Sequence, residues 1–154
     1  MGGTISVAPP TGKEGPEMPA HDDAEALIRR YYAAFNAGDA EAMLALLAED
    51  VDHDINQGGR EVGIPAFRAF MARMNAHYRE QLRDIVVMGT EDGTRGAAEF
   101  TVHGTYLATD AGLPEAAGQT YVLPAGAFFE IRDGRIARVS NTYNLADWIA
   151  QVGG

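Results

Sequence analysis

The order of the helical and strand patterns constrains this chain more than any other feature. In the first half, apolar residues recur at helical spacing, and from residue 83 the pattern changes to β-branched and aromatic runs. Turn signals separate these runs at Glu91-Asp92-Gly93, Asp110-Ala111-Gly112 and Asp133-Gly134. The pattern predicts strands at about 83–90, 95–108, 119–131 and 135–144, and a closing helix over 145–152. Three helices followed by antiparallel strands indicate an α+β fold, in which a curved sheet wraps around the helices.

The first helix, expected over 22–37, carries its apolar residues on one face. Leu27, Tyr31 and Phe35 recur every four residues, so they form a stripe that must pack against an apolar partner. Tyr31 needs a hydrogen-bond partner or a cavity for its hydroxyl, whereas Tyr32 is predicted to point elsewhere and stay at the surface. Tyr31 is therefore a candidate site residue.

Two further helices and a short strand precede the sheet. Gly38 ends the first helix, and Asp39 is expected to cap a second one. The buried positions of that second helix are predicted to be Met43, Leu46 and Leu47. A strand follows at about 51–57, and Pro65 marks the start of a third helix. The apolar face of the third helix comprises Phe67, Phe70, Met71 and Met74.

The length and charge of the chain limit its class. At 154 residues, with 46% hydrophobic and 22% charged residues, we expect one globular domain over 22–152 after a flexible arm, 1–21. No apolar run is long enough to span a bilayer and no signal-peptide pattern is present, so we expect a cytoplasmic protein without a membrane partner. The absence of cysteine excludes disulfides and thiolate metal sites. The formal net charge of −10 argues against a nucleic-acid partner and favours a small neutral ligand.

The strand at 51–57 contains the candidate proton-transfer groups. Side chains alternate between the faces of a strand, so burial of Val51 and Ile55 places His53 on the inner face and Asp54 on the outer face. A single bulge would reverse this assignment. His53 is the preferred catalytic residue, because a desolvated imidazole stays neutral and can accept a proton near neutral pH, and Asp54 is the alternative. His53 could instead be a core histidine that bonds a backbone carbonyl.

The same alternation selects candidate ligand-binding residues on the later strands. The side chains expected to face the cavity are Phe100, Val102, Tyr106, Phe128, Asn141 and Tyr143, with Val122 and Gly126 in the same row as Phe128. His103 is expected on the outer face, and no spacing of His, Asp or Glu matches a metal site.

The strand at 119–131 is apolar on both faces. Its second row, predicted to face away from the cavity, is Leu123, Ala125, Ala127, Phe129 and Ile131. Because the helices can cover only one face of the sheet, a second subunit is expected to cover the other, which predicts a homodimer.

Four segments carry a resemblance to a known family. They are 31–39, with the sequence YYAAFNAGD, then Leu47-Ala48-Glu49-Asp50, 63–70 and 128–136. In these segments the chain resembles the ketosteroid isomerase and SnoaL-like polyketide cyclase group of the nuclear transport factor 2 superfamily. The resemblance covers about residues 22–152 and implies a cone-shaped α+β barrel that opens to an apolar pocket, usually in a homodimer formed through the outer sheet face. It leaves the activity open, because the superfamily includes isomerases, cyclases, dehydratases, hydrolases and non-enzymatic binders.

The resemblance also assigns roles to individual residues. Ketosteroid isomerase uses a carboxylate base, together with a tyrosine and a protonated aspartic acid that donate hydrogen bonds to the substrate oxygen. Tyr31 matches the tyrosine. The base falls at Ile55, or at Asp54 if one gap is allowed, and the acid falls at Gly126, which has no side chain to donate a proton. Efficient steroid isomerisation is therefore not expected.

Two hypotheses about function follow. The first is an enzyme without cofactor or metal that acts by acid–base chemistry on a small apolar carbonyl or polyketide-like compound. His53 or Asp54 would move the proton, and Tyr31, helped by Asn141 or Tyr143, would stabilise the enolate oxygen. The alternative is a ligand-binding or dimeric interaction domain of the same fold without turnover. Gly126 favours the alternative, whereas Tyr31 favours the enzyme, since a plain core position would carry Phe or Leu.

Overall fold

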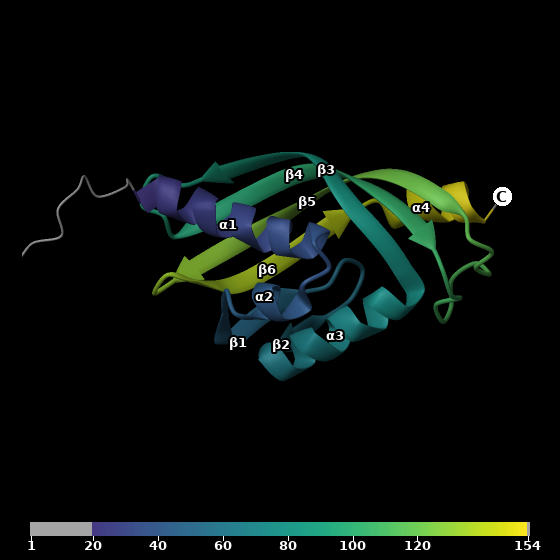
Figure 1. The fold of residues 1–154 in the computed structure, drawn as a ribbon, viewed down its shortest axis with the longest axis horizontal. Coiled ribbons are helices and arrows are strands. Elements are labelled where there is room, and N and C mark those ends of the chain that lie inside the picture. The colour runs from purple at the N-terminus through teal and green to yellow at the C-terminus, as the bar shows by residue number, and fades with distance from the viewer. Residues whose placement is uncertain (1–19, 154) are drawn as a thin grey trace, which may run out of the picture.

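A curved sheet lies over three helices in the computed structural model, which describes residues 20–153 (Figure 1). The helices are α1 (Ala20–Asn36), α2 (Ala40–Leu44), α3 (Ile64–His77) and α4 (Leu145–Val152). The strands are β1 (Leu47–Asp54), β2 (Arg60–Val62), β3 (Tyr78–Gly89), β4 (Arg95–Tyr106), β5 (Thr120–Arg132) and β6 (Arg135–Tyr143). The predicted α+β class is confirmed. The expected N-terminal arm lies outside the described residues, except that positions 20 and 21 belong to α1.

The strands form one six-stranded sheet in the order β2-β1-β6-β5-β4-β3. β1 and β6 are parallel, and every other neighbouring pair is antiparallel. The edge strands β2 and β3 do not pair with each other, so the sheet is curved without closing into a barrel. In Figure 1 the sheet arches over α1, α2 and α3, and α4 lies at the end where the chain finishes. The concave side of the sheet therefore faces the helices.

Several element boundaries differ from those predicted, chiefly around α2 and β1. The α2 helix is a single turn, and Leu47, expected in that helix, begins β1. Leu47 pairs with Ile136 of β6, and both side chains are fully buried. Pairing with a distant strand thus sets the start of β1, and this cannot be read from local helix propensity. The structure also contains the short β2, which the sequence did not predict, and β3 begins earlier than expected.

The turn between α1 and α2 agrees with the sequence analysis. Gly38 has a φ of 70°, a conformation in which glycine avoids the strain of a Cβ atom. The Asp39 side chain caps α2, and its Oδ1 accepts a hydrogen bond from the Ala42 N–H at 3.0 Å.

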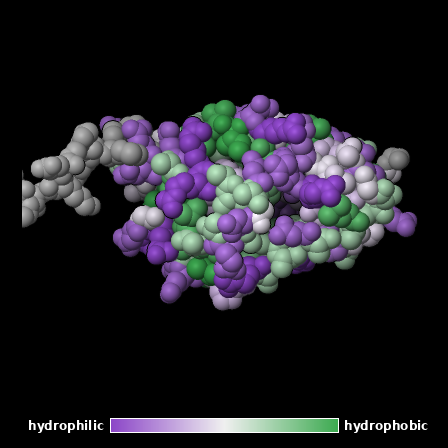
Figure 2. All heavy atoms as spheres, viewed as in Figure 1, coloured by the Kyte–Doolittle hydropathy of each residue, from purple (hydrophilic) through white to green (hydrophobic). Residues whose placement is uncertain are grey.

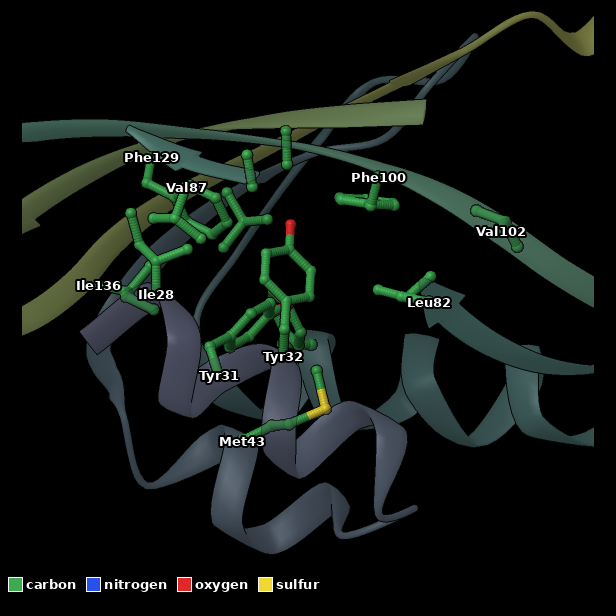
Figure 3. Packing of buried hydrophobic residues seen from close by; sticks show 14 of the residues in the cluster. Ile28, Tyr31, Tyr32, Met43, Leu82, Val87, Phe100, Val102, Phe129 and Ile136 are labelled. Atoms are coloured by element: carbon green, nitrogen blue, oxygen red, sulfur yellow. The ribbon is translucent and has the colours of Figure 1, made fainter. Parts of the chain in front are cut away.

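The prediction that Tyr32 stays at the surface is wrong. Tyr31 and Tyr32 are 6% and 4% exposed, and their rings contact each other edge to face at 5.2 Å. Tyr31 packs against Phe129, whereas Tyr32 also packs against Phe100 (Figure 3). Tyr32 follows the buried Ile28 by four residues, so it extends the buried stripe of α1 rather than leaving it.

The predicted orientation of β5 is also wrong. Phe128 and Val122, expected to face the cavity, are 53% and 52% exposed on the outer face. The opposite row faces the helices, and its members Leu123, Ala127 and Phe129 are buried. Because both rows of β5 are apolar, the alternation itself could not decide which row faces inward.

Hydrophilic and hydrophobic side chains are interspersed on the surface in the view of Figure 2, and one hydrophobic group lies over β3 and β4 near the upper edge. The large apolar side chains exposed on β3 are Val86 and Met88. None of the helices in residues 20–153 is long and apolar enough to cross a membrane.

Candidate functional site

A cavity of about 830 Å³ lies between the concave side of the sheet and the helices. Every helix and most of the strands contribute to its lining, which is largely apolar and aromatic. Its helical wall includes Tyr31 and Tyr32 of α1 with Phe67, Phe70 and Met71 of α3. A cavity of this size, with a few polar groups in an apolar wall, has the character of a small-molecule site.

His53 lies on the inner face of β1, as its alternation with Val51 predicts. It is 1% exposed and lines the cavity. Its imidazole packs against Phe67 at 4.4 Å and meets the edge of Phe70 at 4.6 Å, measured between ring centroids. Two aromatic side chains of α3 therefore hold the ring in position.

Asn141 of β6 is the hydrogen-bond partner of this imidazole. The Nδ2 of Asn141 lies 3.3 Å from the Nε2 of His53, so the amide donates to a neutral imidazole. The parallel pairing of β1 and β6 brings the two together, since His53 is the Cα partner of Val139, two residues before Asn141. Burial lowers the pKa of His53, and the nearby charges of Glu61 and Asp54 partly oppose this effect. The side chain is thus held as the neutral base.

Asp54 lies on the opposite face of the strand, as the pleat predicted. Its carboxylate accepts hydrogen bonds from Arg60 at 2.7 Å and from Arg138 at 2.9 Å. The Arg60 hydrogen bond is the main cause that lowers the pKa of Asp54 to about 2, and Arg138 adds to it. Asp54 does not line the cavity, so the structure gives the alternative base no access to a ligand there.

Polar atoms without partners are concentrated at the cavity wall. Within residues 20–153, three buried side-chain polar atoms lack a hydrogen bond, namely the Tyr32 hydroxyl, Nδ1 of His53 and Nδ2 of Asn56. All three residues line the cavity. Buried polar groups are rarely left unpaired, because each costs about 1–3 kcal/mol of desolvation. Their position indicates a site where a ligand supplies hydrogen bonds.

Both tyrosines of α1 are held in the protonated form. Burial raises the pKa of Tyr31, and burial with the neighbouring Tyr31 raises the pKa of Tyr32. Figure 3 shows the Tyr32 ring upright between α1 and the sheet, with its hydroxyl directed towards the strands. A protonated phenol in such surroundings can donate a hydrogen bond to a ligand oxygen.

Most of the predicted ligand-binding residues meet at the cavity. Phe100, Val102, Asn141 and Tyr143 all line it. Tyr106 is buried on the predicted face but does not line the cavity. Its hydroxyl donates to the Pro114 carbonyl at 2.7 Å and accepts from the Asp110 N–H at 2.9 Å, so it holds the loop after β4. The sixth, Phe128, lies on the outer face as described above.

The sequence analysis missed a carboxyl group of the cavity wall. Glu80 of β3 lines the cavity, and its Oε2 accepts a hydrogen bond from the Tyr121 hydroxyl at 2.9 Å. Burial raises the pKa of this carboxyl, and the hydrogen bond from Tyr121 partly opposes the effect. The strand containing Glu80 was expected to begin only at residue 83, so its side-chain alternation was not considered.

The described part of the chain offers no arrangement for a metal ion. Between residues 20 and 153, no group of three or more His, Asp or Glu side chains lies close enough together to hold one.

Comparisons with known proteins agree with the resemblance found in the sequence. A proposed polyketide cyclase from Pseudomonas putida is 67% identical over 84% of this chain and 97% of its own length, with a TM-score of 0.83. A second one, from Xanthomonas campestris pv. campestris, is 62% identical over 86% of this chain and 98% of its own, with a TM-score of 0.84. An LEH-like epoxide hydrolase from M. tuberculosis shares the fold at 17% identity, covering 88% of this chain and 89% of its own, with a TM-score of 0.67.

No protein among the curated ones matches this chain. Residues 28–139 match the family described as the SnoaL-like domain, which is most of the chain. The chain therefore belongs to the SnoaL-like domain family.

Proposed function

We propose that this protein is a cofactor-free acid–base enzyme of the isomerase or cyclase type, acting on an apolar carbonyl or polyketide-like compound. The observation that carries the proposal is the neutral imidazole of His53, enclosed at an apolar cavity and oriented by Asn141. The similarity to proposed polyketide cyclases supports the same class of substrate.

In the proposed reaction, His53 removes a proton from the carbon beside the substrate carbonyl. Its Nε2 accepts the proton when the Asn141 amide turns aside, which the 3.3 Å contact between them permits at little cost. The electron pair of the broken C–H bond moves to the carbonyl oxygen, which becomes an enolate. Tyr31 donates a hydrogen bond to this oxygen, with Tyr32 as a second donor, because both phenols remain protonated.

The first step can be tested before the natural substrate is known. Proton abstraction beside a carbonyl exchanges the carbon-bound hydrogen for solvent deuterium, so 2-tetralone in deuterated water serves as the probe. We expect the protein to accelerate exchange above the buffer rate and His53→Ala to reduce the acceleration by about 10²-fold or more. Tyr31→Phe and Tyr32→Phe should each slow exchange, and the larger effect identifies the principal donor.

His103→Ala is the matched control, because this histidine lies outside the cavity. It should exchange 2-tetralone at the rate of the unmodified protein. Equal exchange by His53→Ala and the unmodified protein would contradict the assignment of the base.

The alternative is a binding domain of the same fold, and one observation favours it. His53 is 1% exposed and its Nε2 already bonds Asn141, so a ligand can reach this nitrogen only if the amide moves. This alternative predicts that 2-tetralone binds, as measured by calorimetry, without any exchange above the buffer rate.

We also propose that two copies associate through the outer face of the sheet. Exposed Val86, Met88 and Phe128 support this arrangement, since the helices leave that face uncovered.

A further inference from the structure

The hydrogen bond between Tyr121 and Glu80 crosses an entire strand. Glu80 of β3 pairs with Gly104 of β4, and Gly104 pairs with Tyr121 of β5, so the three residues form one row across the sheet. Neighbouring strands lie about 4.8 Å apart, so the two outer backbones of this row are roughly 10 Å apart. The tyrosine ring spans this gap only because the middle residue is a glycine. A Cβ atom at Gly104 would lie 2.2 Å from Cζ of Tyr121.

Glu80 has a single partner for its two carboxyl oxygens. Oε2 accepts the hydrogen bond from Tyr121, and in residues 20–153 no arginine, lysine or histidine forms an ion pair with this carboxyl. The side chain lines the cavity, and burial raises its pKa. A desolvated carboxyl without a cation gains from any hydrogen-bond donor that a ligand brings.

The surroundings of this carboxyl differ from those of His53. Trp148 of α4 meets the ring of Tyr121 edge to face at 5.9 Å, and it meets the ring of Tyr78 at the same distance. All three aromatic residues line the cavity. Tyr121, the partner of Glu80, thus belongs to an aromatic cluster from β3, β5 and α4, whereas the aromatic neighbours of His53 come from α3.

The register places the two polar groups in different rows of the sheet. His53 pairs through Val139 with Phe129, whereas Glu80 pairs through Gly104 with Tyr121, eight residues earlier on β5. Measured along the curved β5 at about 3.3 Å per residue, the two rows are roughly 26 Å apart. A ligand group that reaches Glu80 is therefore distinct from the one that reaches His53.

We propose that Glu80, oriented by Tyr121, forms a second polar subsite that binds a hydroxyl or protonated amine of the ligand. Oε2 accepts a hydrogen bond from Tyr121 and the other carboxyl oxygen has no partner within the described part of the chain, so this subsite offers an acceptor to a ligand donor, whereas the His53 end takes the carbonyl. The inference rests on the proposed function only in that the ligand occupies the same cavity. It makes the ligand an elongated molecule with a carbonyl towards one end and a donor group towards the other.

Three naphthalene probes test the subsite by calorimetry: 2-naphthol, 2-naphthylmethylamine and the apolar 2-ethylnaphthalene. Glu80→Gln keeps the size of the side chain and removes its charge. It should weaken binding of at least one donor probe about tenfold or more and leave 2-ethylnaphthalene within twofold. Tyr121→Phe should act in the same direction, because it frees the carboxyl to rotate away from the cavity.

Glu99→Gln is the matched control, since Glu99 is an exposed carboxylate outside the cavity, and it should leave all three affinities unchanged. Equal weakening of the three probes by Glu80→Gln, no weakening of any, or no binding of either donor probe to the unmodified protein would overturn the subsite.

The same variants separate this inference from the proposed function. If Glu80→Gln has no effect on donor binding while the unmodified protein exchanges 2-tetralone and His53→Ala does not, the subsite is wrong and the acid–base proposal stands. If Glu80 selects donors but 2-tetralone is not exchanged, the acid–base proposal fails alone.

Discussion

His53 is the residue whose protonation should link stability to pH. Burial lowers its pKa below the usual value of 6.5, so between 6.5 and the lowered value the unfolded chain binds more protons than the folded one. The free energy of unfolding therefore rises with pH across this window and falls as the solution is acidified through it. We expect urea denaturation at a series of pH values from 7.5 to 5 to show this loss of stability.

Two histidine variants isolate the contribution of this one side chain. His53→Gln removes the titrating group, so the slope of unfolding free energy against pH should flatten below pH 6.5, even though the variant is less stable throughout. His103→Gln is the same substitution at a histidine outside the cavity, so the difference between the slopes of the two variants reports on the cavity histidine. Parallel slopes for the unmodified protein and His53→Gln would mean that other groups cause the acid loss.

At the level of single residues, the sequence was informative wherever polar and apolar side chains alternate. In β1, the burial of Val51 determined which side chains face inward, and both His53 and Asp54 lie on the faces predicted. In β5 both rows are apolar, and Phe128 was assigned to the wrong face. Glu80 was missed because a charged residue near an expected strand start resembles a solvated one until its register is known.

Gly104 is the residue that allows the Tyr121 side chain to cross β4. Because a Cβ atom there would overlap the Tyr121 ring, Gly104→Ala should force the ring away from β4 and break its hydrogen bond to Glu80. We expect a loss of about 1–3 kcal/mol in the free energy of unfolding, typical of overpacking in a core.

The double variant Gly104→Ala/Tyr121→Phe separates the two causes of this loss. The double variant keeps the overlap of Cβ with the ring but has no hydroxyl to lose. The difference in unfolding free energy between it and Tyr121→Phe therefore measures the overlap alone. A Gly104→Ala protein with unchanged stability and an intact hydrogen bond, seen in a crystal structure, would refute the role assigned to this glycine.

At the level of elements, the long helices and the strands β4, β5 and β6 were predictable, whereas α2 and the edges of the sheet were not. Predicted strands match β4, β5 and β6 closely, since turn signals bound each of them. The start of β1 depends on parallel pairing with β6, which lies more than eighty residues later in the chain. The short β2 pairs only with β1 and carries no apolar alternation of its own. Such contacts are non-local, so a local pattern does not contain them.

For the whole molecule, the exposed outer face of the sheet is the feature that the fold of one chain leaves unexplained. Met88, Ala97 and Phe128 form one row across β3, β4 and β5 through their pairings. Met88 and Phe128 are 48% and 53% exposed, and Val86 lies on the same face two residues from Met88. Adjacent apolar side chains of this size are typical of a surface that another subunit covers.

Phe128→Glu tests the proposed homodimer at the centre of this row. We expect the unmodified protein to sediment as a dimer. The variant should raise the dimer dissociation constant by about 10²-fold or more, because a buried unpaired carboxylate opposes association. The melting temperature of the unmodified protein should rise with protein concentration, as it must when association stabilises the folded chain.

Val62→Glu provides the control, since Val62 is 59% exposed but lies on β2 at the opposite edge of the sheet. This variant should remain dimeric and keep the concentration dependence of melting. If both variants sediment like the unmodified protein, the apolar row is not the interface, whatever the oligomeric state. If instead Phe128→Glu dissociates but still binds naphthol and exchanges 2-tetralone, each subunit contains a complete cavity and the dimer serves only to cover the sheet.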